Sequence, residues 1–270
     1  MRKIESVDEL KKIQLDILIS FHEFCVEHNI KYSLAAGSLI GAVRHKGFIP
    51  WDDDIDVYLL REDYNKLVEL YPKMYNEKYS LITLERDSRW HRTFGKLCNI
   101  QTIEIEDVRN KYYEIGIGID VFPIDAAPDD EKEWIKFNRN RMFLRDLITI
   151  KSMTYSAKRG IIKNTIMFIS RVLLVPFSFS FLCKTLNQYA QKYNDKGTNH
   201  VYENCLGVYN SKRPWLKVDF DQVISSSFEN HIIYIMKGFD DYLSCVYGDY
   251  MELPPVEKRV STHTVKAFWK

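Results

Sequence analysis

Apolar residues recur every three or four positions near the start of the chain, which predicts an amphipathic helix ending near His28. Ser6 is followed three residues later by Glu9, and this spacing is typical of a capping box at the beginning of a helix. The apolar stripe consists of Leu10, Ile13, Ile17, Phe21 and Phe24. The chain is therefore expected to open with a helix that packs one face against a core.

Short segments rich in β-branched and aromatic residues come next, separated by polar turns, and they predict strands. These strands are expected at residues 31–35, 55–60, 79–84, 94–98, 102–105 and 115–122, with short helices at 39–44 and 63–71. After residue 131 the periodicity is helical as far as 150, and the tail indicates a strand at 223–228 and a helix at 239–247. Residues 189–209 are rich in Tyr and Asn, which predicts irregular polar surface. The order indicates an α+β protein: a mixed domain over 1–128 and a more helical region over 129–270.

Composition narrows the class of protein without identifying it. The 270 residues are 46% hydrophobic and 28% charged, which excludes a disordered chain, a collagen-like fibre and a disulfide miniprotein. The formal net charge of +1 provides no global field, so we expect no nucleic-acid partner and only local binding of anions.

The cysteines and the N-terminal residues indicate the cellular compartment in which the protein is expected. Five widely spaced cysteines without a C-x-x-C pair indicate neither a zinc cluster nor a disulfide framework. Charged residues stand at the N-terminus where a signal peptide needs an apolar segment. The expected location is the cytoplasm.

Residues 161–182 form a long apolar stretch that complicates this picture. Lys163, Arg171 and Pro176 argue against a membrane span, because a central arginine and a helix-breaking proline are both costly there. Two alternatives remain, a buried helical hairpin and a surface that contacts a membrane. The second predicts peripheral contact with the inner face of the cell membrane, with Lys163, Arg171 and Lys184 near the headgroups.

Acidic residues are concentrated at positions 52–56. Asp54 and Asp56 flank Ile55 on the predicted strand, so both carboxylates are expected on one face. Two hard oxygen ligands suit Mg²⁺ or Mn²⁺. Asp52 is expected at the edge of this site, and Asp53 on the opposite side. An acidic solvated turn is the alternative.

Gly37 and Ser38 precede these acids at a predicted strand-to-helix turn. Backbone amides at the start of a short helix can bind phosphate oxygens. A phosphate-binding turn followed by an acidic strand is the arrangement that transfer at phosphorus requires.

A third carboxylate is expected from a neighbouring strand. Asp120 lies between apolar residues, and a charge in such a strand needs a metal or a proton to offset burial. It is expected to complete the metal site or to accept the proton of an attacking hydroxyl. Asp125 follows Pro123 and is interpreted as a turn residue or a helix cap.

The basic candidates for phosphate binding are Arg44, His45 and Lys96. Arg44 and His45 would equally well brace the loop between the turn and the acids. Lys96 stands in an apolar strand, from which its ammonium could instead reach the surface.

Three separated motifs, at residues 37–56, 118–125 and 247–255, resemble the LicD family of the nucleotidyltransferase-fold superfamily, with fukutin and fukutin-related protein as distant relatives. The match is weak only over about 130–215. The resemblance implies a nucleotidyltransferase-like mixed sheet flanked by helices. It also implies transfer of phosphocholine, or a similar phospho-alcohol, from a CDP-activated donor to a hydroxyl of a glycan or lipid-linked glycan of the lipopolysaccharide or teichoic acid type, with release of CMP.

Carried over by position, the resemblance makes Asp54 and Asp56 metal ligands, Asp52 the preceding acid of the motif, and Asp120 the third carboxylate and candidate base. Gly37 and Ser38, with Arg44, His45 and Lys96, would bind the donor. The sequence departs from the usual nucleotidyltransferase pattern in one respect: fifteen residues separate Ser38 from Asp54, slightly more than is usual. The loop at Pro50 and Trp51 is therefore expected to reshape the donor pocket.

Other functions use the same residues. A nucleotidyltransferase acting on a small alcohol or antibiotic would retain the other half of the nucleotide, and a glycosyltransferase would use Asp54 and Asp56 as its metal motif. A non-catalytic glycan- or lipid-binding module is the fourth interpretation. Choline would need an aromatic surface, for which Trp51, Tyr58 and Trp90 are candidates that more often serve in packing.

Overall fold

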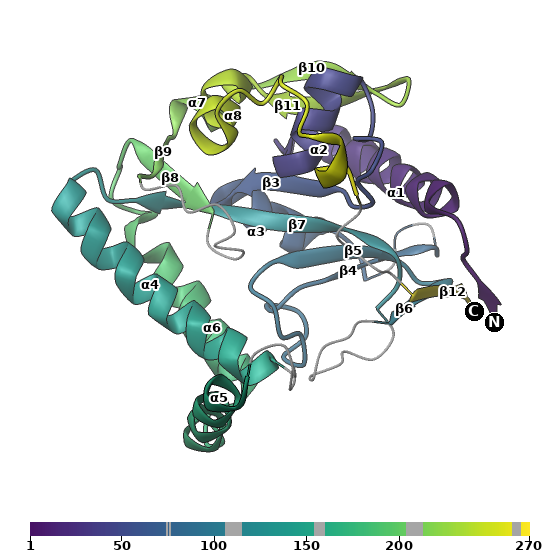
Figure 1. Cartoon of the computed structure of the whole chain (residues 1–270). Helices are drawn as coiled ribbons and strands as arrows, with labels where there is room; N and C mark the ends of the chain where they lie inside the picture. Colours follow the sequence, from purple (N-terminus) through teal and green to yellow (C-terminus); the bar gives the residue numbers. More distant parts are fainter. Residues whose placement is uncertain (74, 76, 106–114, 154–159, 204–212, 261–265) are drawn as a thin grey trace.

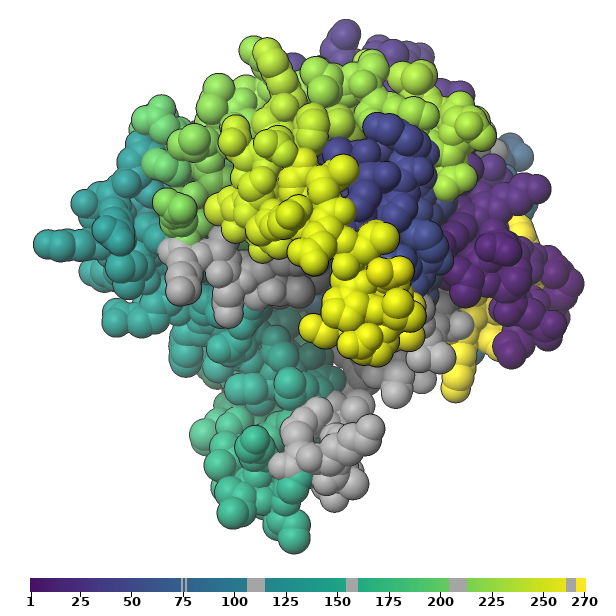
Figure 2. Space-filling view, turned by 45° about the horizontal axis from the view of Figure 1, so that its top comes forward, coloured from purple at the N-terminus to yellow at the C-terminus, as the bar shows by residue number. Residues whose placement is uncertain are grey.

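The computed structural model describes residues 1–270 except 74, 76, 106–114, 154–159, 204–212 and 261–265. A central sheet runs across the molecule, with α1 (Val7–Glu27) and α2 (Ala36–Ile40) on one side of it (Figure 1). The group formed by α4 (Glu131–Ser152), α5 (Ile161–Leu173) and α6 (Phe179–Ala190) lies at the opposite side. The space-filling view shows the yellow-green and yellow residues around α8 (Phe239–Tyr247) lying against the blue-violet surface that includes α2 (Figure 2). Segments that are far apart in the sequence therefore meet above the same part of the sheet.

The central sheet has the strand order β2-β3-β7-β5-β4, and β8 pairs with β7 while β9 pairs with β8. β3 and β7 run parallel, whereas the remaining pairs are antiparallel. The strands are β2 (Ser33–Leu34), β3 (Asp56–Leu60), β4 (Tyr79–Ile82), β5 (Gly95–Asn99), β7 (Gly118–Ala127), β8 (His200–Glu203) and β9 (Trp215–Leu216). This mixed sheet with its flanking helices confirms the predicted α+β class.

Two smaller sheets join distant parts of the chain. The first has the order β1-β12-β6, where β1 is Arg2–Lys3, β12 is Lys266–Trp269 and β6 is Thr102–Ile105, so the two termini lie side by side (Figure 1). The second is the hairpin of β10 (Val223–Phe228) and β11 (His231–Met236). Strands from the second half of the sequence thus complete the sheets of the first, and a domain boundary near residue 128 stays a prediction.

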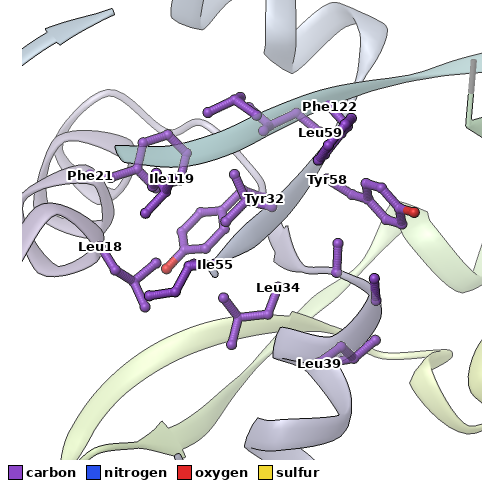
Figure 3. Packing of buried hydrophobic residues seen from close by; sticks show 14 of the residues in the cluster. Leu18, Phe21, Tyr32, Leu34, Leu39, Ile55, Tyr58, Leu59, Ile119 and Phe122 are labelled. Atoms are coloured by element: carbon purple, nitrogen blue, oxygen red, sulfur yellow. The ribbon is translucent and has the colours of Figure 1, made fainter. Parts of the chain in front are cut away.

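Helix α1 (Val7–Glu27) begins where the capping box predicts. The Glu9 amide donates to Ser6 Oγ at 3.0 Å, but the Glu9 carboxylate accepts from the Trp269 indole at 2.9 Å and from Arg2. Only half of the capping box therefore forms, because the C-terminal strand offers the carboxylate another donor. The apolar stripe of α1 packs on the sheet, where Leu18 and Phe21 approach Tyr32, Ile55 and Ile119 (Figure 3).

The remaining helices are α2 (Ala36–Ile40), α3 (Arg61–Leu70), α4 (Glu131–Ser152), α5 (Ile161–Leu173), α6 (Phe179–Ala190), α7 (Val218–Asp221) and α8 (Phe239–Tyr247), with a π-helix η1 (Gly41–His45) and two short 3-10 helices, η3 (Gln191–Tyr193) and η4 (Val256–Lys258). The strand predicted at 223–228 and the helix predicted at 239–247 are confirmed.

The expectation of irregular polar surface at 189–209 holds for residues 194–199, which form turns and are mostly exposed, and 204–209 lie outside the described residues. It is wrong for 189–193 and 200–203, which belong to α6, η3 and β8 and where Tyr193, Val201 and Tyr202 are buried. Tyr202 stacks edge-on against Trp134 and Phe137 of α4. Tyrosine rings fill a core here because each ring is apolar except at its hydroxyl.

The apolar stretch 161–182 divides into two unlike helices. α6 buries Leu182, Cys183 and Leu186, as the hairpin interpretation expected. α5 leaves most of its apolar residues exposed, so the buried-hairpin interpretation is wrong for this helix. Among the residues that the structure describes, none of the helices is long and apolar enough to cross a membrane.

Candidate active site

The turn between β2 and α2 is tied directly to the start of β3. Ala36, the first residue of α2, has a φ of +46°, and no side chain caps this helix. Ser38 Oγ accepts a hydrogen bond from the Asp56 amide at 3.0 Å. A residue other than glycine in this conformation is strained, and the surrounding structure has to enforce it. The predicted glycine–serine turn therefore lies against the predicted acidic strand.

Three charged residues form one row across the sheet. Asp56 pairs with Asp120 in the parallel register of β3 and β7, and Asp120 pairs with Lys96 in the antiparallel register of β7 and β5. Residues that pair across strands project to the same face. The sheet thus brings Asp56, Asp120 and Lys96 together, although 64 positions separate the two aspartates along the chain.

Aromatic residues border this row on the same face of the sheet. Tyr58 and Phe122 stand two positions beyond Asp56 and Asp120, and their rings meet edge-on with centroids 6.1 Å apart. Phe94 lies 4.4 Å from Phe122 by ring centroids. The charged row therefore has an apolar wall on one side, which strengthens electrostatic interactions within it.

The aspartates of the 52–56 segment and Asp120 perturb one another. Burial raises the pKa of Asp56 well above its ordinary value, and the charges of Asp54, Asp120 and Asp52 raise it further. β3 begins at Asp56, so Asp54 lies just before the strand and not on it. Asp54 is close enough for its charge to affect Asp56, but the strand alternation that predicted a shared face does not apply to Asp54, and a joint role of the two carboxylates stays a prediction.

Lys96 is buried among carboxylates. Its Nζ lies 3.2 Å from Glu104 Oε2 and 3.5 Å from Asp120 Oδ1, and its side chain is only 9% exposed. Burial alone lowers the pKa of Lys96, but Asp120 and Glu104 outweigh that effect and the net shift is upward. The alternative that Lys96 reaches the surface is wrong. Glu104 was missed in the sequence, although it interrupts the isoleucines of β6 as a buried acid would.

Asp52 lies against the glycine of the turn. A Cβ atom added at Gly37 would stand 2.5 Å from Asp52 Oδ2, closer than real contacts allow. The Asp52 amide donates to Ile49 O at 3.0 Å, which closes the loop before the acids. Asp53, expected on the opposite side, is buried with 4% exposure. The absence of a side chain at Gly37 therefore gives the Asp52 carboxylate its place.

We expect Gly37→Ala to lower turnover about tenfold to a hundredfold while the fold is kept, because displacement of a site group by about 1 Å has costs of this order. The new methyl group would push a flexible carboxylate and not backbone atoms. A double-mutant cycle checks the cause. In an Asp52→Ala background, Gly37→Ala should have almost no further effect on turnover, and an unchanged loss there would contradict this explanation.

Arg44 and His45 hold loops together. Arg44 Nη1 donates to Tyr250 O at 2.6 Å and to Glu252 O at 3.2 Å, within the 247–255 motif. Its Nε donates to His45 Nε2 at 3.0 Å. Burial and the charge of Arg259 lower the pKa of Arg44. The contacts described for Arg44 are those of the bracing alternative, and donor binding by Arg44 and His45 stays a prediction.

The loop at Pro50 and Trp51 is held from several sides that the sequence did not indicate. Lys11 of α1 donates to Ile49 O at 3.2 Å and to Pro50 O at 3.1 Å. The Arg259 guanidinium stands 5.7 Å from the Trp51 ring centroid. Of the aromatic candidates for choline, Tyr58 and Trp90 are fully buried, whereas Trp51 is partly exposed beside the acids.

Glu229 fixes the other end of this loop. It accepts from the Phe48 amide at 3.0 Å, and its own amide donates to Lys46 O at 2.9 Å. Glu229 stands in the β10–β11 turn, where a φ of +48° is followed by +64° at Asn230. A turn far along the chain therefore shapes the loop that carries the acids, which no local sequence signal could reveal.

Asp125 belongs to the sheet and not to a turn or a helix cap. It is fully buried in β7 and accepts two hydrogen bonds from Arg61, from Nε at 2.7 Å and from Nη2 at 2.6 Å. Asn194 Nδ2 donates to its Oδ1 at 2.9 Å. The prediction failed because Pro123 lies inside β7, between Val121, the last residue paired with β5, and Ile124, the first paired with β8, where no partner strand needs its amide.

The surroundings of the Asp56 and Asp120 carboxylates favour binding of a divalent cation. Asp120 Oδ1 is buried and, apart from its ion pair with Lys96, has no hydrogen-bond donor among the described residues, while burial and then the neighbouring carboxylates raise the pKa of Asp56. A cation bound by oxygen ligands would relieve both conditions. No group of three His, Cys, Asp or Glu side chains in the described part of the chain is arranged as a metal site. The donor chemistry fits a hard cation such as Mg²⁺.

A glycine–serine turn after a short strand, followed by aspartates on two parallel neighbours of a mixed sheet, is the arrangement expected of a phosphotransferase of the nucleotidyltransferase type. Residues 29–157 match the LicD/FKTN/FKRP nucleotidyltransferase domain. The chain is 32% identical over 273 residues to the lipopolysaccharide cholinephosphotransferase LicD of Haemophilus influenzae, covering 99% of each protein. It is 36% identical over 154 residues to an uncharacterised protein of Rickettsia typhi, covering 48% of this chain and 50% of that protein. The chain therefore belongs to the LicD family and is a phosphotransferase enzyme.

Proposed function

We propose that this enzyme transfers phosphocholine, or a similar phospho-alcohol, from a CDP-activated donor to a hydroxyl of a lipopolysaccharide-type glycan, releasing CMP. The observation that carries the proposal is the row of Asp56, Asp120 and Lys96 directly beside the Gly37–Ser38 turn. Full-length similarity to a cholinephosphotransferase supports phosphocholine as the group and lipopolysaccharide as the acceptor. A teichoic acid acceptor is the alternative glycan.

In the proposed reaction, the acceptor oxygen forms a bond to the phosphorus that carries choline. The bond from that phosphorus to the bridging oxygen of the donor breaks, and CMP leaves with the electron pair. The hydroxyl proton passes to the Asp120 carboxylate, whose Oδ1 accepts no hydrogen bond within the described structure. Lys96 Nζ lies 3.5 Å from this same oxygen and balances the charge of the carboxylate. Asp120 thus acts as the general base in this proposal.

Asp54 and Asp56 would hold Mg²⁺, or Mn²⁺, with Asp52 beside them, and the alternative role of Asp120 is to complete this metal site. The ion, when bound, supplies positive charge that stabilises the phosphoryl oxygens during transfer. Ser38 keeps Asp56 in place through its hydrogen bond to the Asp56 amide. The first-turn amides of α2, at Gly37 and Ser38, are proposed to bind donor phosphate oxygens.

The competing functions differ in what they release. A nucleotidyltransferase that modifies a small alcohol or antibiotic would release pyrophosphate, and a glycosyltransferase would transfer sugar. A glycosyltransferase would have no use for a phosphate-binding turn at Ser38. That turn is nevertheless hydrogen-bonded to the acidic strand in this structure. A module that only binds glycan or lipid would show no turnover.

Incubation with CDP-choline, CDP-ethanolamine or CDP-ribitol, each with Mg²⁺ and a lipopolysaccharide acceptor, tests the proposal. We expect CMP release with CDP-choline and incorporation of labelled choline into the acceptor. Chelation with EDTA should stop the reaction, and added Mg²⁺ should restore it. Pyrophosphate release from a nucleoside triphosphate, or transfer from a nucleotide sugar without CMP release, would refute it.

A further inference from the structure

Helix α5 presents an apolar side to solvent. Its seven exposed apolar side chains have between 53% and 84% of their surface accessible: Ile161, Ile162, Ile166, Phe168, Ile169, Val172 and Leu173. At 100° per residue these positions span an arc of about 160° around the helix. Val175, Phe177 and Phe181 extend the same surface into the following turn and α6, with exposures of 72%, 43% and 53%. We call these ten residues the α5 surface.

The opposite side of α5 fixes the orientation of this surface. Asn164 and Met167 are buried, and Arg171 Nε donates to Ile150 O of α4 at 3.1 Å. Lys151 of α4 reaches Leu174 O, just after α5, with its Nζ at 2.9 Å. Figure 1 shows α5 beyond α4 and α6, at the edge of the molecule farthest from β10 and β11. The helix is therefore attached by its polar and sulfur-containing side, and its apolar side faces outward.

The segment of sequence that carries the α5 surface has charges of one sign. Residues 147–194 contain no Asp or Glu but seven Lys or Arg, in a chain whose totals are 37 and 38. Within the described part, Lys163 and Lys184 are exposed beside the apolar side chains. An apolar helix face with basic residues along its margin is the pattern of helices that lie in the interface of a bilayer containing anionic lipids.

We propose that the α5 surface docks the enzyme onto an anionic lipid bilayer, with α5 parallel to the membrane plane. Its apolar side chains would enter the boundary between headgroups and acyl chains, and Lys163 and Lys184 would contact the headgroups. The helix has 13 residues, about 20 Å, which is shorter than the hydrocarbon core. A second copy of the chain fits less well, because a symmetric contact would bring two basic surfaces together.

Vesicle flotation tests this proposal without donor or acceptor, so its outcome is independent of the proposed function. The probes are phosphatidylglycerol–phosphatidylcholine vesicles and pure phosphatidylcholine vesicles. We expect the wild type to float with the first and much less with the second, and high salt to weaken binding. Leu173→Asp and Ile162→Asp should each reduce the floated fraction at least about fivefold. Val218→Asp in α7, at a residue 65% exposed elsewhere on the molecule, is the matched control and should float as the wild type does.

Thermal unfolding of each variant separates loss of membrane binding from loss of folding. The unfolding midpoints should stay unchanged, because Ile162, Leu173 and Val218 are all exposed. Lys163→Glu combined with Lys184→Glu should remove the preference for anionic vesicles while leaving the unfolding midpoint unchanged. A wild type that stays unbound would overturn the proposal, as would Leu173→Asp floating equally well. A concentration-dependent dimer in light scattering that Leu173→Asp dissociates, without vesicle binding, would assign the surface to a second copy instead.

Discussion

Asp56→Asn is expected to abolish turnover and, in the metal-free protein, to raise the unfolding temperature. Asparagine keeps the volume but removes a charged ligand, and a lost metal site costs several kcal/mol of transition-state stabilisation, or at least about a thousandfold in rate. The free energy of unfolding should increase, because burial and three neighbouring carboxylates disfavour the charge of Asp56, which asparagine lacks. Removing an unfavourable contribution of about 1 kcal/mol would raise the midpoint of thermal unfolding by about 2–4 °C.

The pH dependence of stability follows from the same shift. The pKa of Asp56 is raised in the folded state, so the native protein binds this proton more tightly than the unfolded chain, whose aspartates titrate near about 4. The contribution of Asp56 is therefore favourable at low pH and is lost as pH rises through its folded pKa. The wild type should lose stability over that range, and Asp56→Asn should lose less. Activity should show the opposite trend, because the ionised carboxylate is the form that binds metal.

Substitutions of other aspartates test whether the loss of turnover is specific to the site. Asp54→Asn and Asp120→Asn should be comparably inactive, and an unchanged Mg²⁺ dependence with lost rate would assign Asp120 to proton transfer. Asp16→Asn, at a side chain 49% exposed on α1, makes the same chemical change outside the site and should alter neither rate nor midpoint. Activity of Asp54→Asn or Asp56→Asn within a few-fold of wild type would contradict the assignment of the site.

Arg61→Met is expected to destabilise the fold by about 3–5 kcal/mol, which corresponds to about 10 °C in the unfolding midpoint. Arg61 and Asp125 form a two-point ion pair whose side chains are 7% and 0% exposed. Removing the guanidinium leaves a buried carboxylate with only Asn194 as a described donor. The loss is therefore mainly the cost of an uncompensated charge, and thermal or urea unfolding measures it.

The double variant Arg61→Met, Asp125→Leu separates this cause from simple loss of packing. It should be more stable than Arg61→Met alone, because apolar replacement of a buried pair is often tolerated. Asp221→Asn is the matched control, since Asp221 and Lys217 form an exposed ion pair on α7 with side chains 41% and 43% exposed. That change should cost less than about 1 kcal/mol. Equal costs for Arg61→Met and Asp221→Asn would contradict the argument.

Local patterns predicted the parts of the molecule that local physics determines. The β10 and α8 segments were placed correctly because β-branched alternation and helical periodicity act over a few residues. The motif at 37–56 indicated a turn beside an acidic strand, and Ser38 and Asp56 are indeed bonded. Asp120 was predicted from its burial cost within an apolar strand, and the parallel register of β3 and β7 places it beside Asp56.

Partners separated by tens of residues could not be predicted in the same way. Glu104 acquires its role only when β6 is placed beside Lys96, and Glu229 only when a distant turn meets Gly47 and Phe48. Asp125 was misjudged because its neighbour Pro123 indicated a turn, while its partner Arg61 lies 64 positions earlier. Such pairings depend on tertiary register, which a single sequence does not display.

The small sheet that joins the two ends of the chain has a consequence for biosynthesis. β6 carries Glu104, whose backbone partner is Ala267 of β12, and β12 also pairs with β1. Chains emerge from the ribosome N-terminus first, so β1 and β6 have no common partner until the residues of β12 have been made. The strand that carries Glu104 therefore gains its pairing with β12 late in synthesis, well after the strand that carries Lys96. The ion pair beside Asp120 thus rests on a small sheet that forms later than the strands on which Lys96 and Asp120 stand.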